Sequence, residues 1–558
     1  MLKGRFDSEY IYVRLDTKDH TIFKSEVELL KGLDGTFDFK TKEWVFPIDK
    51  EETLKRNGLK VTVLNTNQEY PVVNINRTRV PFIRDYQVAP LEYSISRKGR
   101  ILLADDVGLG KTLSSIAFFA YTKVNYPLLI ITTASTKPQW EAEFNRFNTW
   151  GLKTAVLSGV ESVTLIDADV VIINYDLLSY HIKQVGGNKW NPKFAPTEGL
   201  LALKSMHFQG LIIDECQRMK ADTSLWTKAI KYLANGVPNV LALSATPAEN
   251  KPIEFFNVLN LLRPDLFDNY DAFGMQFCDG KKAVRYTKIK GKVKKREFWD
   301  YTGASNKELL NKLMRHHLMF RRNKHDAIPG LPKAVPVPLP LKLSSSTMTE
   351  YADILSGKTE IFTKSGEKMD DSKLVRQNYM REFCANEKMD YVVQFLLDFL
   401  SNSDEKIVVF TEHHDIIDLL AKKFKKYCVV FDGRCSSKQK EAAKAKFITG
   451  NARIIFGQIT SMGEGVDGFQ NICNKMMIVE LPYKPTLITQ AVGRLERVGS
   501  TASTVTVYFP ILLGTIEETV MGMITDKSTN ILTILDGDGD GAGNIGRQIT
   551  KLLDSIMA

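Results

Sequence analysis

The chain has 558 residues, of which 44% are hydrophobic and 25% are charged, and its formal net charge is +10. This length predicts two to four domains of ordinary globular composition, and no apolar run is long enough to span a membrane. The six scattered cysteines form no C-x-x-C pair, which argues against a zinc site and a disulfide framework. The basic balance favours a polyanionic partner such as nucleic acid.

Residues 1–75 differ from the rest of the chain. They contain short β-like patches around residues 37–47, FDFKTKEWVFP, and no phosphate-binding loop. We interpret them as a small accessory domain.

Apolar strands alternate with helical patterns from about residue 80 to residue 265. The predicted strands are 101–104, 128–132, 170–173, 211–214 and 240–243. Buried strands separated by helices indicate a parallel sheet covered on both faces, so this region predicts one α/β lobe.

A candidate nucleotide-phosphate cradle follows the first of these strands. Residues 104–112, ADDVGLGKT, contain a glycine-rich turn and then Lys-Thr at the start of a helix. Lys111 would supply a positive charge to the β- and γ-phosphates, and the Thr112 hydroxyl is an oxygen ligand suited to Mg²⁺. The strict pattern has glycine where this chain has Asp105, so an ordinary strand-to-helix turn is the alternative. The predicted phosphate-binding residues are Asp105, Gly108, Leu109, Gly110, Lys111 and Thr112.

A second motif ends another apolar strand. Residues 211–217, LIIDECQ, place two carboxylates at the strand's C-terminal end, where open α/β sheets bind their ligands. Asp214 would hold Mg²⁺, and Glu215 would orient and deprotonate the attacking water. An Asp-Glu pair alone is commonly a solvated strand end, but together the two motifs indicate a nucleoside-triphosphate hydrolase.

Residues 281–296, KKAVRYTKIKGKVKKR, carry nine basic residues and no acidic one. Lysine and arginine alternate with Tyr286, Ile289 and Val293 around Gly291, which predicts a two-stranded hairpin with one basic face. Such a face would bind phosphates without reading sequence, and a solvated basic loop is the alternative. The residues predicted to contact DNA are Lys137, Lys288, Lys290, Lys292, Lys294, Lys295 and Arg296.

Residues 329–340, PGLPKAVPVPLP, contain five prolines and predict an extended connector. A second α/β lobe follows. Its predicted strands are 406–410, 429–431, 453–456, 476–480 and 504–509.

The second lobe offers basic side chains to a phosphate site. Within residues 490–499, QAVGRLERVG, a helix would place Arg494 and Arg497 on one face, where one could clamp the γ-phosphate and the other act as an arginine finger. A surface-charged helix is the alternative. Upstream, residues 463–467, GEGVD, predict a tight turn that would carry lobe closure to both ATP and nucleic acid, with Gly465 and Asp467 on the ATP side.

The order and spacing of these segments resemble the SNF2 branch of the superfamily 2 helicase-like ATPases over roughly residues 80–520. The segments that carry the resemblance are RDYQ (84–87), DDVGLGKT (105–112), TTASTKPQWEAEF (132–144), DECQ (214–217), LALSATPAENKPIEFFNVLNLLRP (241–264), FRRNK (320–324) with LPK (331–333), GEGVD (463–467) and the Arg494/Arg497 stretch. Within that branch the chain is similar to the HARP-type annealing helicases, through FWDYTGASN (298–306) and, more loosely, EWVFP (43–47).

The resemblance implies two RecA-like lobes and several further roles. Arg84 and Gln87 would read the adenine. Gln217 stands where the family has histidine, and Ser-Ala-Thr at 244–246 replaces Thr-Gly-Thr. The residues that would couple ATP to DNA are Gln217, Ser244, Thr246 and Gln490. The predicted regions are 1–75 (accessory), 80–265 (lobe 1), 266–385 (insertion and connector), 386–525 (lobe 2) and 526–558 (tail).

By resemblance we expect a DNA-dependent ATPase that uses ATP and Mg²⁺ and translocates on duplex or branched DNA. Its output would be annealing, fork regression or branch migration in DNA replication, repair or recombination. The alternatives are a general duplex translocase that displaces proteins from DNA, a non-hydrolysing DNA-binding scaffold and an RNA helicase. We expect a monomer without membrane association, in the cytoplasm of a bacterium or of a virus-infected cell, or in the nucleus of a eukaryote.

Overall fold

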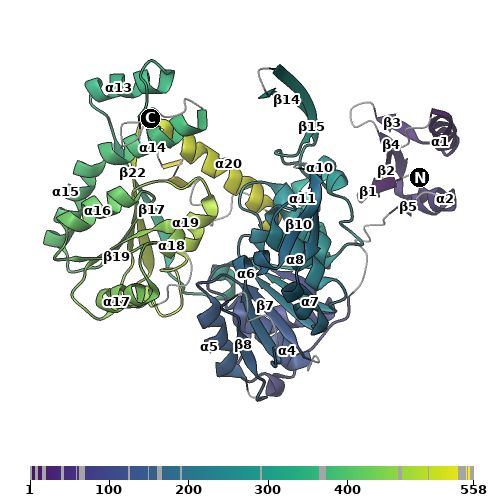
Figure 1. The fold of residues 1–558 in the computed structure, drawn as a ribbon, viewed down its shortest axis with the longest axis horizontal. Coiled ribbons are helices and arrows are strands. Elements are labelled where there is room, and N and C mark those ends of the chain that lie inside the picture. The colour runs from purple at the N-terminus through teal and green to yellow at the C-terminus, as the bar shows by residue number, and fades with distance from the viewer. Residues whose placement is uncertain are drawn as a thin grey trace.

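The computed structural model describes residues 3–6, 10–14, 20–38, 43–57, 60–61, 70–122, 126–148, 150–159, 166–188, 191–289, 292–362, 373–462, 468–500, 502–537, 548–549 and 551–552. Figure 1 shows an N-terminal domain in purple, a central lobe 1 in blue and teal, and a lobe 2 in green and yellow.

The N-terminal domain is built on a five-stranded sheet of order β3-β4-β2-β1-β5. Its core forms because Trp44 and Phe46 alternate along β4 and pack with Ile11 and Val13 of β2, all four of which are buried. Its elements are β1 (Lys3–Phe6), β2 (Tyr10–Arg14), α1 (His20–Gly32), β3 (Thr36–Asp38), β4 (Glu43–Pro47), η1 (Ile48–Lys50), α2 (Glu51–Arg56) and β5 (Lys60–Val61).

Lobe 1 contains a seven-stranded, all-parallel sheet of order β16-β6-β13-β12-β7-β9-β8. Alternate residues of β7 enter different hydrophobic cores, Leu129 and Ile131 on one face of the sheet and Leu128 and Ile130 on the other. Both faces are therefore buried, as the continuous apolar runs predicted. The strands are β6 (Arg100–Leu103), β7 (Leu128–Thr132), β8 (Thr154–Val156), β9 (Val170–Asn174), β12 (Gly210–Asp214), β13 (Asn239–Leu243) and β16 (Met319–Phe320).

The helices and short helical turns of lobe 1 connect these strands. They are η2 (Arg77–Arg79), η3 (Asp85–Gln87), α3 (Val88–Ser96), α4 (Lys111–Thr122), α5 (Lys137–Phe147), α6 (Tyr175–Tyr180), α7 (Glu198–Ser205), η5 (Cys216–Lys220), α8 (Leu225–Ala234), η6 (Pro252–Phe255), α9 (Phe256–Leu262), α10 (Tyr270–Phe277) and α11 (Lys307–His317). Helix α12 (Lys324–Ala327) follows the last strand of lobe 1 and lies in the segment that leads to lobe 2.

Two hairpins stand apart from this sheet. One, β10 (Ile182–Asn188) with β11 (Asn191–Pro196), had no counterpart in the sequence prediction. The other, β14 (Lys281–Ile289) with β15 (Lys292–Asp300), confirms the hairpin predicted from the basic segment.

Lobe 2 contains a six-stranded, all-parallel sheet of order β17-β22-β21-β18-β20-β19. Its strands are β17 (Lys333–Leu341), β18 (Ile407–Thr411), β19 (Cys428–Phe431), β20 (Ile454–Gln458), β21 (Lys475–Ile478) and β22 (Thr504–Leu512). Its helices are α13 (Ser345–Ser356), α14 (Lys373–Glu387), α15 (Met389–Asn402), α16 (His414–Lys423), α17 (Ser437–Ile448), α18 (Ile459–Met462), η7 (Phe469–Asn471), α19 (Pro485–Val492) and α20 (Ile516–Asp536).

The proline-rich segment is extended, as predicted, but it is an edge strand of lobe 2 and not a free connector. Pro336, Pro338 and Pro340 alternate along β17, which pairs with β22 on one side. Successive N–H groups along a strand point to opposite sides, so the three alternating prolines lack N–H groups on one side only. That side faces away from β22, where an edge strand has no ladder partner.

The two lobes are joined by a short connecting segment and by a long helix. The last strand of lobe 1 ends at Phe320 and the first strand of lobe 2 begins at Lys333, so residues 321–332 form the connecting segment. Helix α20 buries Val520 and Ile524 in the core of lobe 2, and Ile531 and Ile534 in the core that includes α11 of lobe 1 (Figure 1). The tail predicted to begin at residue 526 therefore starts inside this helix.

Candidate active site

The predicted phosphate loop, residues 104–112, links β6 to α4. Gly108 and Gly110 have φ values of 91° and 72°, a left-handed conformation that glycine adopts without a steric penalty. A Cβ atom on Gly110 would also lie 2.7 Å from Nε2 of Gln87, and that amide donates a hydrogen bond to the Gly110 carbonyl at 3.2 Å. Gln87 therefore fastens the loop to the RDYQ segment.

Lys111 lies at the start of α4 with its ammonium group turned back over the loop. Its Nζ donates to the main-chain oxygens of Asp105 and Asp106 at 2.7 and 3.3 Å. Burial lowers the pKa of this ammonium, while Glu215, Asp105 and Asp106 oppose the shift. A phosphate group would offer this ammonium an anionic partner in place of the two carbonyl groups.

The side chain of Asp105 serves a different purpose from the one predicted. Its carboxylate is 1% exposed and accepts hydrogen bonds from Arg322, at 2.9 Å from the main-chain nitrogen and 2.6 Å from Nη2. Asp105 thus binds the connecting segment through its side chain, and it contacts Lys111 only through its main-chain oxygen.

Asp214 is the last residue of β12, and residues of β7, α5 and α6 hold it in place. Its Oδ2 accepts hydrogen bonds from the Thr132 hydroxyl and the Trp140 indole, each at 2.8 Å. The Tyr175 hydroxyl donates to the Asp214 main-chain oxygen at 2.6 Å. Burial and the charge of Glu215 raise the pKa of Asp214 to about 6, although the hydrogen bonds from Trp140 and Thr132 act in the opposite direction.

The sequence analysis missed Thr132, Trp140 and Tyr175 as site residues. Trp140 is buried, and its indole N–H donates to the candidate metal ligand Asp214. The signal available in the sequence was the position of Thr132 at the end of β7, which pairs directly with β12.

Glu215 begins a chain of hydrogen bonds that reaches the next strand. Its φ of 50° is left-handed, an uncommon conformation for a residue other than glycine. Gln217 Nε2 donates to Glu215 Oε2 at 2.7 Å, and the Ser244 hydroxyl donates to Gln217 Oε1 at 2.7 Å. The Thr246 main-chain N–H then donates to the Ser244 hydroxyl at 3.0 Å. Of the predicted coupling residues, Gln217 therefore bonds directly to Glu215, and Ser244 and Thr246 are linked to it through Gln217.

Lobe 2 contributes Arg494 and Arg497 from a series of turns, because α19 ends at Val492 and the predicted helix does not continue. Arg497 nevertheless reaches the phosphate loop: a Cβ atom on Gly108 would lie 3.7 Å from its Cγ. Between the two arginines, the buried Glu496 pairs with Lys324 of the connecting segment.

A cleft of about 580 Å³ brings most of the predicted site residues together. Those lining it are Arg84, Gln87, Gly108, Gly110, Lys111, Thr112, Asp214, Glu215, Gln490, Arg494 and Arg497. Leu109 is buried within the loop. Gly465 and Asp467 lie outside the described residues.

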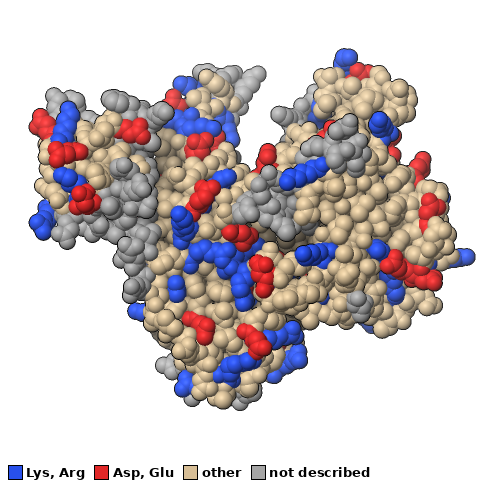
Figure 2. All heavy atoms as spheres, turned by 180° about the vertical axis from the view of Figure 1, so that it is seen from behind, with Lys and Arg blue, Asp and Glu red and all other residues tan. Residues whose placement is uncertain are grey.

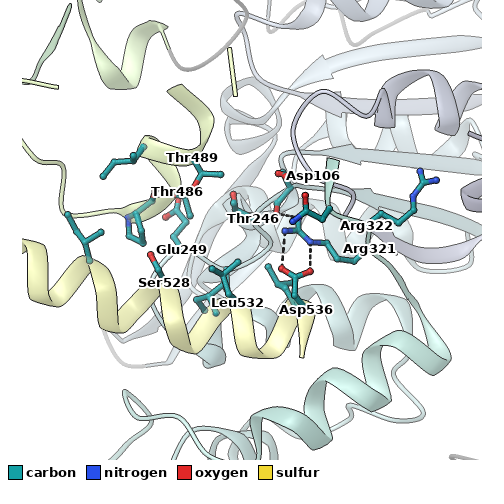
Figure 3. Close-up of a pocket in the computed structure, with 18 of the residues that line it drawn as sticks. Asp106, Thr246, Glu249, Arg321, Arg322, Thr486, Thr489, Ser528, Leu532 and Asp536 are labelled. Carbon is teal, nitrogen blue, oxygen red and sulfur yellow. Dashed lines mark hydrogen bonds and ion pairs between the residues drawn. The ribbon is translucent and has the colours of Figure 1, made fainter. Parts of the chain in front are cut away.

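A second cavity, of about 430 Å³, lies between the lobes beside this cleft. Thr246 and Glu249 line it from lobe 1, and Thr486 and Thr489 line it from α19 (Figure 3). Arg321 closes one end by pairing with Asp536 of α20, with Nε 3.0 Å from Oδ1.

Few of the predicted DNA contacts have described side chains. Lys137 donates to the Leu157 carbonyl at 2.6 Å, and Lys295 pairs with Glu297 at 3.0 Å. The side chains of Lys288, Lys290, Lys292, Lys294 and Arg296 lie outside the described part. Figure 2 shows basic side chains gathered near the middle of the rear face, with acidic ones among them, below a hollow open at the top of the view.

The described residues contain no helix with the length and apolar character needed to cross a membrane. They also contain no group of three or more His, Cys, Asp or Glu side chains placed to share a metal ion.

Two family models match the chain. One, described as SNF2-related domain, matches residues 86–389, which is more than half of the chain, and the other, described as Helicase conserved C-terminal domain, matches residues 387–499. The two matches meet at the start of α15, ahead of the central strands of lobe 2.

Curated relatives extend this likeness. A Bos taurus protein named SWI/SNF-related matrix-associated actin-dependent regulator of chromatin subfamily A-like protein 1 is 26% identical, over 90% of this chain and 52% of that protein. The Homo sapiens protein named DNA annealing helicase and endonuclease ZRANB3 is 24% identical, over 82% of this chain and 40% of that protein. The chain spans about half the length of the first of these relatives and less of the second. The predicted resemblance to annealing helicases is confirmed.

One solved structure, described as the Sulfolobus solfataricus SWI2/SNF2 ATPase core in complex with dsDNA, is 21% identical and covers 87% of this chain and 98% of that chain. Its TM-score is 0.37.

Proposed function

Because the chain belongs to the SNF2-related family, we propose that it is a DNA-dependent ATP hydrolase that translocates on duplex or branched DNA. Its output is the remodelling of forks or junctions, by annealing, fork regression or branch migration. The observation that carries the proposal is the single cleft in which Lys111, Asp214 and Glu215 of lobe 1 face Arg494 and Arg497 of lobe 2. The printed name of the human relative, a DNA annealing helicase, supports the choice of output.

ATP would lie in this cleft with its phosphates on residues 108–112 and its adenine near Gln87. Thr112 and Asp214 would hold Mg²⁺, since a hydroxyl and one carboxylate are the protein donors that this ion takes beside nucleotide phosphates. When bound, Mg²⁺ neutralises charge on the β- and γ-phosphates.

The residues of this chain supply the remaining chemistry. Glu215, oriented by Gln217, takes the proton of the attacking water, and Lys111 holds the phosphates. Arg494 and Arg497 stabilise the negative charge that develops on the transferring phosphoryl group. Closure of the lobes completes the site and opening resets it, so each cycle moves one lobe relative to the other along DNA.

The proposal extends to the predicted regions and partners. DNA is the macromolecular partner, bound largely without sequence preference, and the chain acts as a monomer. Residues 1–75 form an accessory domain, 80–265 with 266–320 form lobe 1 and its insertion, and lobe 2 begins at β17 and ends within α20.

The test is the steady-state ATPase rate without nucleic acid and with single-stranded DNA, plain duplex, a three-way fork and a four-way junction. We expect the fork and the junction to stimulate hydrolysis most, and the Lys111→Ala variant to abolish it. Equal stimulation by plain duplex would support a general translocase that displaces proteins. Hydrolysis that no DNA stimulates would contradict the motor, and a Glu215→Gln variant indistinguishable from wild type would support a non-hydrolysing scaffold.

A further inference from the structure

The hairpin of β14 and β15 is an arm whose two faces differ. Its strands form a two-stranded sheet of their own, and Figure 1 shows them standing away from lobe 1 above α10 and α11. Because an isolated hairpin has no second layer to cover it, its side chains are open to a partner.

The register of the hairpin assigns residues to faces, since directly paired residues share a face of an antiparallel sheet. One face carries three described pairs, which are Lys282 with Trp299, Val284 with Glu297, and Tyr286 with Lys295. We call these six residues the aromatic face. Arg285 belongs to the opposite face, with its guanidinium 5.2 Å from the centre of the Phe298 ring.

The aromatic face exposes large apolar side chains to solvent. Tyr286 is 67% exposed, Val284 45% and Trp299 38%. Charged groups lie among them: Lys282 Nζ is 5.7 Å from the centre of the Trp299 ring, and Lys295, directly opposite Tyr286, pairs with Glu297 of the same face at 3.0 Å. The phosphate of a bound strand would compete with this carboxylate for Lys295. Exposed rings interleaved with charged residues do not form the contiguous apolar patch that a buried protein interface needs.

This combination fits an unpaired nucleic acid strand. Aromatic rings stack on the faces of bases, and nearby lysines bind the phosphates between them. Trp299 is paired with Lys282, which lies four residues from Tyr286 along β14, so the two rings are separated by about 14 Å along the hairpin. They can therefore stack on different nucleotides of one strand. A duplex keeps its base faces stacked on one another, and only unpaired bases can present them to a protein.

We infer that the aromatic face binds the unpaired strand at a DNA branch, with bases stacked on Tyr286 and Trp299 and phosphates bound by Lys282 and Lys295. The nine basic and no acidic residues of 281–296 match a polyanion. The inference rests on the proposed function for the identity of the polymer as DNA. It adds that the arm senses single-stranded character, whereas a purely basic hairpin would bind any phosphate backbone.

The test compares the affinity of the full chain for two fluorescein-labelled DNAs by anisotropy at one salt concentration. One is a fork with two unpaired arms, and the other is a blunt duplex with the same paired length. The Tyr286→Ala/Trp299→Ala variant should bind the fork at least tenfold more weakly and the duplex within twofold of wild type. The Tyr286→Phe/Trp299→Phe variant keeps both rings and should retain fork affinity within about threefold.

A matched control lies on the opposite face. Arg285→Gln removes one charge next to Tyr286 in sequence, and any loss should be the same for fork and duplex. Equal losses on both DNAs in the double alanine variant would overturn the inference, and so would fork affinity unchanged in that variant.

A second measurement uses the wild-type chain and so does not depend on the folding of a variant. A fork with 5-iododeoxyuridine in its unpaired arm should crosslink to Tyr286 or Trp299, as identified by mass spectrometry. Crosslinks confined to other residues would overturn the inference. Neither readout depends on ATP hydrolysis. A chain without DNA-stimulated ATPase activity would contradict the proposed motor, but its affinities for fork and duplex could still be compared.

Discussion

Asp105 occupies the position at which the phosphate-loop pattern has glycine, and its contacts explain why a carboxylate is there. The residue lies at the end of β6 beside the nucleotide cleft, yet its side chain binds Arg322 of the connecting segment. A single residue therefore links the start of the phosphate loop to the chain that leads into lobe 2.

We predict that the Asp105→Gly variant is less stable than wild type, although it restores the glycine pattern. The expected loss in the free energy of unfolding is about 2–4 kcal/mol, which overlaps the lower part of the range for removing one partner of a buried ion pair. The side chain of Arg322 is only 21% exposed in the wild type, and in the variant it would lose its carboxylate partner. Urea unfolding of the full chain measures the change. Asp105→Asn keeps an acceptor for the Arg322 main-chain N–H and should lie between the two; a glycine variant as stable as wild type would contradict the assignment.

The hydrogen-bonded chain from Glu215 through Gln217 and Ser244 to Thr246 suggests how the cleft communicates with the neighbouring strand. We predict that Gln217→Ala and Ser244→Ala each lower the DNA-stimulated ATPase rate about tenfold, with ATP affinity within about twofold. The reason is that Glu215, the proposed general base, loses the side chain that orients it while the phosphate loop is intact.

The double variant sharpens this prediction. If both residues act through one chain, Gln217→Ala/Ser244→Ala should be no slower than the slower single variant. Losses that multiply to about a hundredfold would show independent roles instead.

At the scale of elements, Tyr70 docks the segment that follows the N-terminal domain onto lobe 1. Its hydroxyl lies 3.0 Å from Nδ1 of His317 on α11 and accepts from Arg263 at 3.2 Å. The guanidinium of Arg97 lies 3.8 Å from the centre of the Tyr70 ring. Burial, together with the neighbouring His316 and Arg263, lowers the pKa of His317 to about 4.

This docking contact should make lobe 1 sensitive to acid. The unfolded chain protonates His317 near pH 6.5, whereas the folded chain resists protonation until about pH 4. The unfolded state therefore binds more protons in that window, and stability is full above pH 6.5 and falls as the pH is lowered toward 4. We predict that His317→Asn, which cannot titrate, has a flatter dependence of the lobe 1 melting temperature on pH.

The exposed His207 provides the control for that experiment. Its φ of 51° is a conformation that asparagine tolerates, so His207→Asn should keep the wild-type pH dependence. Parallel curves for wild type and His317→Asn would argue against the role of His317.

The elements differ in how well their sequence predicted them. Strands such as 128–132 were predicted with their bounds, because a continuous apolar run buried on both faces is a local signal. The strand character of 333–341 was missed because alternating prolines are compatible with a sheet only at an edge, and edge position is a property of the whole sheet. The two-residue β16 carries too short a pattern to detect.

In the candidate site, too, the sequence predicted the features that arise locally and missed those that depend on distant parts of the chain. The phosphate loop and the Asp214/Glu215 pair were found from short motifs that fix their own backbone geometry. The Asp105–Arg322 pair joins residues 217 positions apart, and the contacts of Trp140 and Tyr175 with Asp214 also depend on how the strands assemble. Long-range side-chain pairing leaves no signal in a single sequence.

In the molecule as a whole, three basic residues of the connecting segment form ion pairs with three different parts of the structure. Arg321 pairs with Asp536 of α20, Arg322 with Asp105 beside the phosphate loop, and Lys324 with Glu496 between the two arginines of lobe 2. Helix α20 then spans both cores beside the cavity of Figure 3. The lobes are thus joined by a segment that lines the cavity between them and pairs with residues next to the nucleotide cleft in sequence, Asp105 in lobe 1 and Glu496 in lobe 2. This arrangement suits the proposed motor, in which closure of the cleft moves one lobe relative to the other.

The ATPase rate of the Arg497→Ala variant shows whether the two lobes share one active site. We predict that DNA-stimulated kcat falls at least about a hundredfold, as expected for an arginine that stabilises the transferring phosphoryl group, while affinity for a fluorescent ATP analogue changes less than about threefold. Arg434→Ala removes an arginine of lobe 2 that pairs with Asp418 and Asp432, outside the cleft, and should hydrolyse ATP as wild type does. An Arg497→Ala variant with a rate within twofold of wild type would contradict the shared site.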